Sequence, residues 1–123
     1  MTLEWRRQLE EAGVDVASAL ERMMGSEALL ERLLGKFLED PQYPALCGAM
    51  KGGDAARAVI AAHTLKGVCG NLSMNGLYGL FTELVDALRE EDLPLADRLM
   101  EQIEPAYNRV AAAIREHAED GRA

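Results

Sequence analysis

The chain has 123 residues, of which 49% are hydrophobic, 28% charged and only 5% aromatic, with a formal net charge of -8. This length suits a single domain with one buried core, and a composition rich in Ala, Leu, Glu and Arg favours helices. So acidic a chain disfavours binding to nucleic acid or to an anionic membrane surface. No apolar run approaches the roughly 18 residues that span a bilayer, and the start lacks the apolar region of a secretory signal. We therefore expect a cytoplasmic protein.

Apolar residues repeat at helical spacing along almost the whole chain, and no segment alternates as a strand would. The breaks between these segments are glycines, prolines and residues that cap helices. Short helices are expected within residues 3–24, longer ones at about 26–40, 54–72, 76–91 and 94–118, and a turn with a short helix within 43–54.

Four substantial helices joined by short connections predict an all-α fold, an antiparallel up-down four-helix bundle with short additional N-terminal helices. Ser73 or Asn75 is expected to begin the helix over 76–91, and Pro105 is expected to kink or divide the last helix. The bundle core is expected over about 26–118 and the N-terminal helices over about 3–24, in one domain of residues 1–123.

The stretch "AAHTLKGVCGNLSMNG", residues 61–76, places two glycines inside a predicted helix, beside one of only two histidines in the chain. At about 100° per residue, one side of this helix collects the apolar stripe: Ala58, Ala61, Leu65, Val68, Cys69 and Leu72. The opposite side collects the unusual residues: His63, Lys66, Gly67 and Gly70, with Ile60, Asn71 and Met74 around them. His63 is therefore predicted to face away from the core.

The two glycines need an explanation, because each costs a helix interior up to about 1 kcal/mol relative to alanine. Close packing against a neighbouring helix is the usual reason, but Gly67 and Gly70 are predicted to face outwards. Bare backbone beside an exposed imidazole suggests that a bulky partner approaches it. Lys66, three residues after His63, can place its ammonium beside an anion on the ring. A nucleophilic imidazole, a cation and an open surface fit transfer of a phosphoryl group to nitrogen.

The remaining residues that could bind a metal carry little signal. His117 is isolated in a charged C-terminal segment and is expected to be solvated. Cys47 and Cys69 belong to no ligand pattern and are expected to be free thiols in a reducing cytosol. A metal or haem bundle would need ligands that converge from several helices, so no metal site is predicted.

The string "AHTLKGVCGNL", residues 62–72, resembles the signature of histidine phosphotransfer (HPt) domains, in which His-x-x-Lys-Gly is followed by a glycine three residues later. His63, Lys66, Gly67 and Gly70 occupy the matching positions, and the order of helices agrees over roughly residues 12–118. The resemblance implies a phosphorelay intermediate. His63 would accept a phosphoryl group through Nε2 from the aspartate of one response-regulator receiver domain and pass it to another.

The resemblance also implies the roles of the neighbouring residues and the partners. Lys66 would help to neutralise the phosphate, and Gly67 and Gly70 would let the receiver close over the ring, with Ile60, Asn71 and Met74 as access or docking residues. The receiver would supply Mg²⁺, so this chain is expected to bind no cofactor. With no Gly-rich ATP-binding segment, it is expected to be a monomeric carrier without kinase activity of its own; a hybrid sensor histidine kinase is a further candidate partner.

Two positions depart from the family's pattern. Ser73 stands where the family often has a glycine. Val85 aligns with a Gln or Glu that in many members forms a hydrogen bond with the other ring nitrogen of the histidine. Thr82, Asp86, a water molecule or a backbone carbonyl would have to orient the His63 ring instead.

Two other functions remain open from the sequence. The chain could be the phospho-accepting domain of a larger chemotaxis-type or hybrid histidine kinase, although its Met start and capped ends favour a free-standing module. It could also be a helical adaptor bundle that no longer transfers phosphate, but the presence of His63 with Lys66 argues against that.

Overall fold

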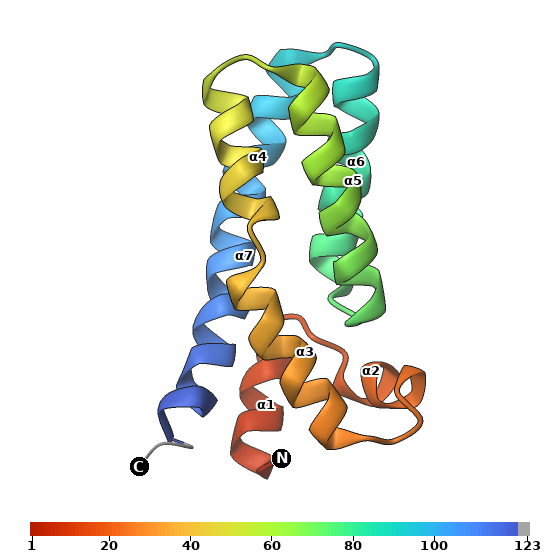
Figure 1. The fold of residues 1–123 in the computed structure, drawn as a ribbon, viewed down its shortest axis with the longest axis vertical. Coiled ribbons are helices and arrows are strands. Elements are labelled where there is room, and N and C mark those ends of the chain that lie inside the picture. The colour runs from red at the N-terminus through yellow and green to blue at the C-terminus, as the bar shows by residue number, and fades with distance from the viewer. Residues whose placement is uncertain (121–123) are drawn as a thin grey trace.

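Helices make up most of the part of the chain that the structure describes. The computed structural model describes the backbone of residues 1–120 and the side chains of residues 1–116. Within that part it forms seven helices and no strand (Figure 1). In chain order these are α1 (Leu3–Glu11), α2 (Val16–Arg22), α3 (Glu27–Glu39), α4 (Gln42–Lys51), α5 (Ala55–Asn71), α6 (Asn75–Arg89) and α7 (Leu93–Asp120). The prediction of an all-α fold is confirmed.

The helices form four antiparallel columns (Figure 1). α3 and α4 follow each other along the first column, and α5, α6 and α7 form the other three, each opposite in direction to the one before. α5 packs against both α4 and α6, while α7 packs against α6 and α3. This is the up-down four-helix bundle predicted from the helix lengths and short connections.

The first column is interrupted between α3 and α4. Asp40 ends α3 in an extended conformation, and its carboxylate accepts a hydrogen bond from the amide of Gln42 at 2.8 Å. Pro41, which follows Asp40, cannot donate an amide hydrogen bond, and this ends the helix. Pro44 lies in the first turn of α4, where proline is tolerated. The predicted break therefore occurs once, before α4.

Side-chain oxygens cap five helices by accepting hydrogen bonds from backbone amides in the first turn that have no partner within the helix. The capping oxygens belong to Thr2, Asp15, Ser26, Asp54 and Asp92, each of which accepts a hydrogen bond from an amide three residues later at 3.1 Å. Such a cap contributes roughly 1 kcal/mol. The helix starts are thus specified by short polar residues that can be recognised in the sequence.

Three helices are followed, two positions after their last residue, by a non-glycine residue with left-handed backbone: Met24 (φ 55°), Ser73 (φ 53°) and Glu91 (φ 59°). At the end of α5 the amide of Met74 donates to Cys69 O at 2.9 Å, and the amide of Ser73 donates to Gly70 O at 3.2 Å. This pair of bonds is the Schellman motif, in which glycine is favoured because it has no Cβ. Ser73 therefore ends α5 and does not cap α6, whose first residue is Asn75.

The N-terminal helices close one end of the bundle. Trp5 of α1 is buried, and its indole Nε1 donates a hydrogen bond to Ala113 O of α7 at 3.0 Å. At the start of α2, the amide of Asp15 donates to Ser73 O at 2.9 Å. The buried hydroxyl of Ser73 donates to the Ser18 hydroxyl at 3.0 Å. α2 is thus fastened to the turn that joins α5 and α6.

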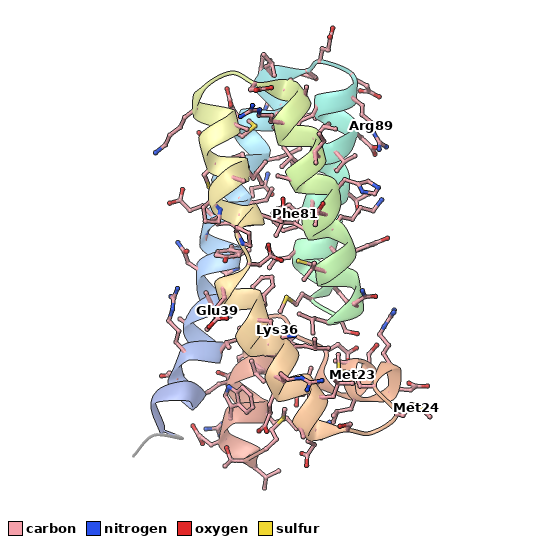
Figure 2. The ribbon with its side chains drawn as sticks, in the orientation of Figure 1. Met23, Met24, Lys36, Glu39, Phe81 and Arg89 are labelled. Carbon is pink, nitrogen blue, oxygen red and sulfur yellow. The ribbon has the colours of Figure 1, made fainter. Side chains whose placement is uncertain are left out.

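The core runs the length of the bundle between the four columns. Phe81 of α6 is completely buried at its centre, whereas Met24, 96% exposed, lies at the outer edge of the turn after α2 (Figure 2). Pro105 lies on the exposed side of α7, which continues through it as one helix. Of the two expected effects of Pro105, a division of the last helix is wrong, and a kink stays a prediction.

Candidate functional site

The surface around His63 is built on α5. His63 and Gly67 are exposed, Lys66 is half-buried, and the apolar stripe on the opposite side of the helix is buried except for Val68, which is partly so. The exposure of His63 thus follows the helical periodicity. In the described part of the chain, no residue forms a hydrogen bond or an ion pair with the His63 ring. The imidazole is therefore accessible to another molecule.

The charge on this helix differs from that of the rest of the protein. α5 contains Arg57, His63 and Lys66 but no Asp or Glu, and α4 contains Lys51 and likewise no carboxylate. The only acid between Gln42 and Asn71 is Asp54, whose carboxylate lies 3.4 Å from the Arg57 guanidinium. In a chain of net charge -8, this local excess of positive charge favours the approach of an anion.

Packing against a neighbouring helix does not explain why a glycine occupies position 67. A Cβ built at this position would meet nothing within 4 Å. An alanine there would therefore fit and would favour the helix by up to about 1 kcal/mol. Because Gly67 has no side chain, the space beside His63 stays open.

Gly70 differs from Gly67 in its surroundings. A Cβ at Gly70 would lie 3.2 Å from both Cδ2 and Cε2 of Tyr78, on α6. This contact is closer than ordinary van der Waals separation, so the glycine lets the aromatic ring pack onto α5. The expectation that Gly70 faces outwards, without packing against a neighbouring helix, is therefore wrong, while its role in access for a partner stays a prediction.

Tyr78 also contacts the lysine of the site. The Nζ atom of Lys66 lies 5.8 Å from the centroid of the Tyr78 ring, within the range of a cation–π interaction. Tyr78 is 42% exposed. Sequence reasoning missed Tyr78, although one signal was present. Residues at equal distances from the tight turn of an antiparallel helix pair come to lie side by side, and Gly70 and Tyr78 are each four residues from Met74.

The three expected access residues separate into two groups. Ile60 is 65% exposed, one turn before His63, and Asn71 is exposed at the end of α5. Met74 is completely buried beneath the turn between α5 and α6. The expectation that Met74 contributes to a docking surface is therefore wrong. It is the N-cap residue of α6, and its side chain packs into the core instead of continuing the exposed side of α5.

Ile60 also lines a shallow groove between α4 and α5 that the sequence did not indicate. On the α4 side it is lined by Gln42 and by three small residues at helical spacing, Ala45, Gly48 and Ala49, with Gly52 directly after the helix. The α5 wall includes Arg57 and Ile60. The accessible apolar surface near His63 therefore extends across α4 as well as along α5.

The residues considered for orienting the His63 ring lie on α6. The contact between Gly70 and Tyr78 sets the register of α5 and α6, which brings His63 level with Val85 and Asp86. Val85 is buried in the core and Asp86 is exposed. The hydroxyl of Thr82 donates to Tyr78 O at 2.7 Å, so its proton is already used. A role in orienting the ring stays a prediction for Asp86 and Thr82.

The two cysteines lie in different surroundings. Cys69 is completely buried on α5, and burial raises the pKa of its thiol to about 12. Cys47 is half-buried, and both are free thiols. Close by, the rings of Tyr43 and Tyr107 stack with centroids 3.7 Å apart, and burial raises the pKa of both phenols. Neither thiol is therefore part of the exposed surface around His63.

The described residues offer neither a cluster of metal ligands nor a membrane-spanning helix. No group of three or more His, Cys, Asp or Glu side chains in that part of the chain is placed to hold a metal ion. None of the helices described is both long and apolar enough to cross a membrane. The expectation for His117 falls on a side chain outside those described.

Comparison with known proteins gives one finding about the family. Neither the curated proteins nor the solved structures include a significant match to the chain. The family model of the Hpt domain matches residues 26–113, which include all of α3, α4, α5 and α6 and most of α7. Members of this family carry phosphoryl groups on histidine in two-component signalling. Because the match covers well over half of its length, the chain belongs to the Hpt domain family.

Proposed function

We propose that the protein is a phosphorelay intermediate: His63 accepts a phosphoryl group from the phosphorylated aspartate of one receiver domain and passes it to the aspartate of another. The observation that carries the proposal is the exposed imidazole of His63 on a helix without carboxylates, inside the region that matches the Hpt family. The accessible nitrogen supplies a nucleophile, and the local positive charge favours a phosphorylated partner.

The reaction exchanges one bond to phosphorus for another. The lone pair of Nε2 on a neutral His63 attacks phosphorus, the P–O bond to the donor aspartate breaks, and that aspartate leaves as a carboxylate. The proton on Nδ1 stays on the ring. In the second step an oxygen of the acceptor aspartate attacks phosphorus and the P–N bond breaks. Neither step consumes ATP, so the chain acts as a carrier.

Electrostatics supports Lys66 as the cation of the site. Its ammonium is on the same side of α5 as His63, one turn away, and it forms no salt bridge among the described residues. It can therefore donate hydrogen bonds to phosphate oxygens on the His63 ring without first leaving a carboxylate. The Mg²⁺ that neutralises the transferring group would come with the receiver domain.

The receiver must also reach the ring closely enough for in-line transfer. The open space at Gly67 gives that access. The exposed side chain of Ile60 and the groove beside it provide an apolar surface for docking, with Asn71 at the other end of the helix. The proposal includes a monomeric, cytoplasmic carrier, with a hybrid sensor histidine kinase as one source of phosphate.

The decisive experiment is direct transfer. The full chain is incubated with a panel of phosphorylated receiver domains and Mg²⁺, and protein-bound phosphate is tested for lability in acid and stability in base, which identifies phosphohistidine. We expect label on the wild type and none on His63→Gln. The matched control is His117→Gln, at the only other histidine in the sequence, which should be labelled like the wild type.

Two results would overturn this proposal. If no receiver transfers phosphate to the wild type while the same receivers phosphorylate another Hpt protein, the chain is not a relay carrier. If His63→Gln is labelled and His117→Gln is not, the phosphate acceptor has been assigned to the wrong residue.

A further inference from the structure

Lys66 has an unusual partner for a lysine in this protein. Two arginines of α1, by contrast, pair with carboxylates of their own helix: Arg6 with Glu10 at 3.1 Å and Arg7 with Glu4 at 2.9 Å. Positions three and four residues from Lys66 on either side hold Ala62, His63, Cys69 and Gly70, none of which is a carboxylate. The group that meets its ammonium is the ring of Tyr78, 5.8 Å away.

The nature of that partner matters for a cation that must bind phosphate. A carboxylate would neutralise Lys66 and compete with the phosphoryl group for its ammonium. An aromatic ring attracts the ammonium through its quadrupole and adds no formal charge. Lys66 is thus held in place while its positive charge stays uncompensated.

The position of the ring is determined by Gly70. A Cβ at Gly70 would be only 3.2 Å from two atoms of the ring, so any other residue there would require Tyr78 to shift by a few tenths of an ångström. The backbone of Tyr78 is held as well: its amide donates to Met74 O at 2.8 Å, and its carbonyl accepts from the hydroxyl of Thr82 at 2.7 Å. Gly70 therefore leaves room for the Tyr78 ring beside α5, and the ring in turn attracts the ammonium of Lys66.

We propose that Tyr78 is a positioning residue that holds the uncompensated ammonium of Lys66 one turn from His63, ready for the phosphoryl group. The inference rests on the proposed function, because it assigns Tyr78 a role in the same transfer. Without the ring, the Lys66 ammonium would lose this contact, and its ordering would have to occur during the transfer itself. Tyr78 touches neither the reacting nitrogen nor the phosphate and acts only through Lys66.

Single-turnover transfer from a phosphorylated receiver tests this role. Tyr78→Phe retains the ring and is expected to transfer at a rate within about twofold of the wild type. Tyr78→Leu retains an apolar side chain without the quadrupole, and its rate should fall about threefold to fivefold, the size of an exposed cation–π interaction. Circular dichroism and thermal unfolding establish that both variants are folded.

A double-mutant cycle shows whether Tyr78 acts through the lysine. Tyr78→Leu should slow the wild type but have no further effect on Lys66→Ala. If it slows Lys66→Ala by the same factor, the ring contacts the partner directly and the inference is wrong. An unchanged rate in Tyr78→Leu alone would also overturn it.

A measurement without any receiver separates this inference from the proposed function. A ring next to the ammonium should shift the ε-methylene protons of Lys66 upfield in NMR spectra of the wild type and Tyr78→Phe, but not of Tyr78→Leu. Absence of that shift in the wild type overturns the inference whatever the transfer assay shows. A wild type that has the shift but accepts no phosphate from any receiver counts against the relay and leaves the contact between Lys66 and Tyr78 intact.

Discussion

The hydroxyl of Ser73 donates a hydrogen bond at 3.0 Å to the hydroxyl of Ser18, although the two residues are 55 positions apart in the chain. This bond links α2, outside the region that matches the Hpt family, to the turn between α5 and α6. α5 carries His63 and α6 carries Tyr78, so the N-terminal helices support the end of the helix pair that forms the site.

The first prediction concerns this link. Ser18→Ala removes the partner of a buried hydroxyl, so we expect it to lower the free energy of unfolding by about 1–2 kcal/mol. Ser73→Gly should be more stable than Ser73→Ala, because only glycine adopts the φ of 53° at this position without strain. Urea unfolding of the three variants gives both comparisons. Equal stability of the two Ser73 variants would contradict the strain argument.

The second prediction uses the end of α6. Glu91 has φ 59°, whereas its neighbour Glu90 has φ -85°, and both side chains are exposed. Glu91→Gly should raise the free energy of unfolding by about 1 kcal/mol because it relieves the left-handed backbone. Glu90→Gly removes the same charge at a right-handed position and should lower it by up to about 1 kcal/mol. Thermal unfolding measures both, and a midpoint that rises in Glu90→Gly as much as in Glu91→Gly would disprove the explanation.

The third prediction separates the two glycines of the site. Gly67→Ala should stabilise the protein by up to about 1 kcal/mol, because its Cβ meets nothing within 4 Å. Gly70→Ala should not gain that stability, since its Cβ must displace the Tyr78 ring from a 3.2 Å contact. Denaturant unfolding compares the two. A gain in Gly70→Ala equal to that in Gly67→Ala would show that the ring moves aside without cost.

The fourth prediction tests access to His63. Gly67→Leu should leave the bundle folded but slow phosphotransfer at least about tenfold, because the added side chain obstructs the approach of the receiver. Gly35→Leu is the matched control: Gly35 is an exposed helical glycine on α3, and its Cβ would also meet nothing within 4 Å. Single-turnover transfer should be normal in this control. A normal rate in Gly67→Leu would refute the role of Gly67 in access.

The fifth prediction concerns alkaline pH. Burial raises the pKa of Cys69 from 9.0 to about 12, and burial also raises the pKa of Tyr43 and Tyr107. The folded protein therefore retains protons that the unfolded chain releases. This stabilisation is complete below about pH 9 and is lost as the pH rises towards the folded values. Urea unfolding between pH 7 and pH 11 should show a falling free energy of unfolding, with a smaller fall in Cys69→Ala; a flat profile would contradict the burial of these groups.

Much of the site could be predicted because it depends on the periodicity of a single helix. The exposure of His63 and Gly67 follows from their spacing relative to the apolar stripe of α5, and the structure confirms it. The caps at Asp15, Ser26 and Asp54 follow from short-range hydrogen bonds. Such features involve residues within one or two turns of each other, which a sequence displays directly.

The errors arose where the chain changes direction or where two helices meet. Met74 continues the exposed side of α5 only if that helix is extended beyond Leu72. The left-handed Ser73 turns the chain before that, and Met74 becomes buried. Gly70 was expected to face outwards because a helical wheel of α5 alone does not include the Tyr78 ring, which belongs to α6.

The sequence by itself determined the helices, their caps, the exposed histidine and the resemblance to the Hpt family, because each depends on residues close together in the chain. The tertiary structure decided which glycine serves packing and which leaves open space, what partner Lys66 has, and how α2 holds the turn at Ser73. These relationships join residues on different helices, and they exist only once α5, α6 and the N-terminal helices have packed together.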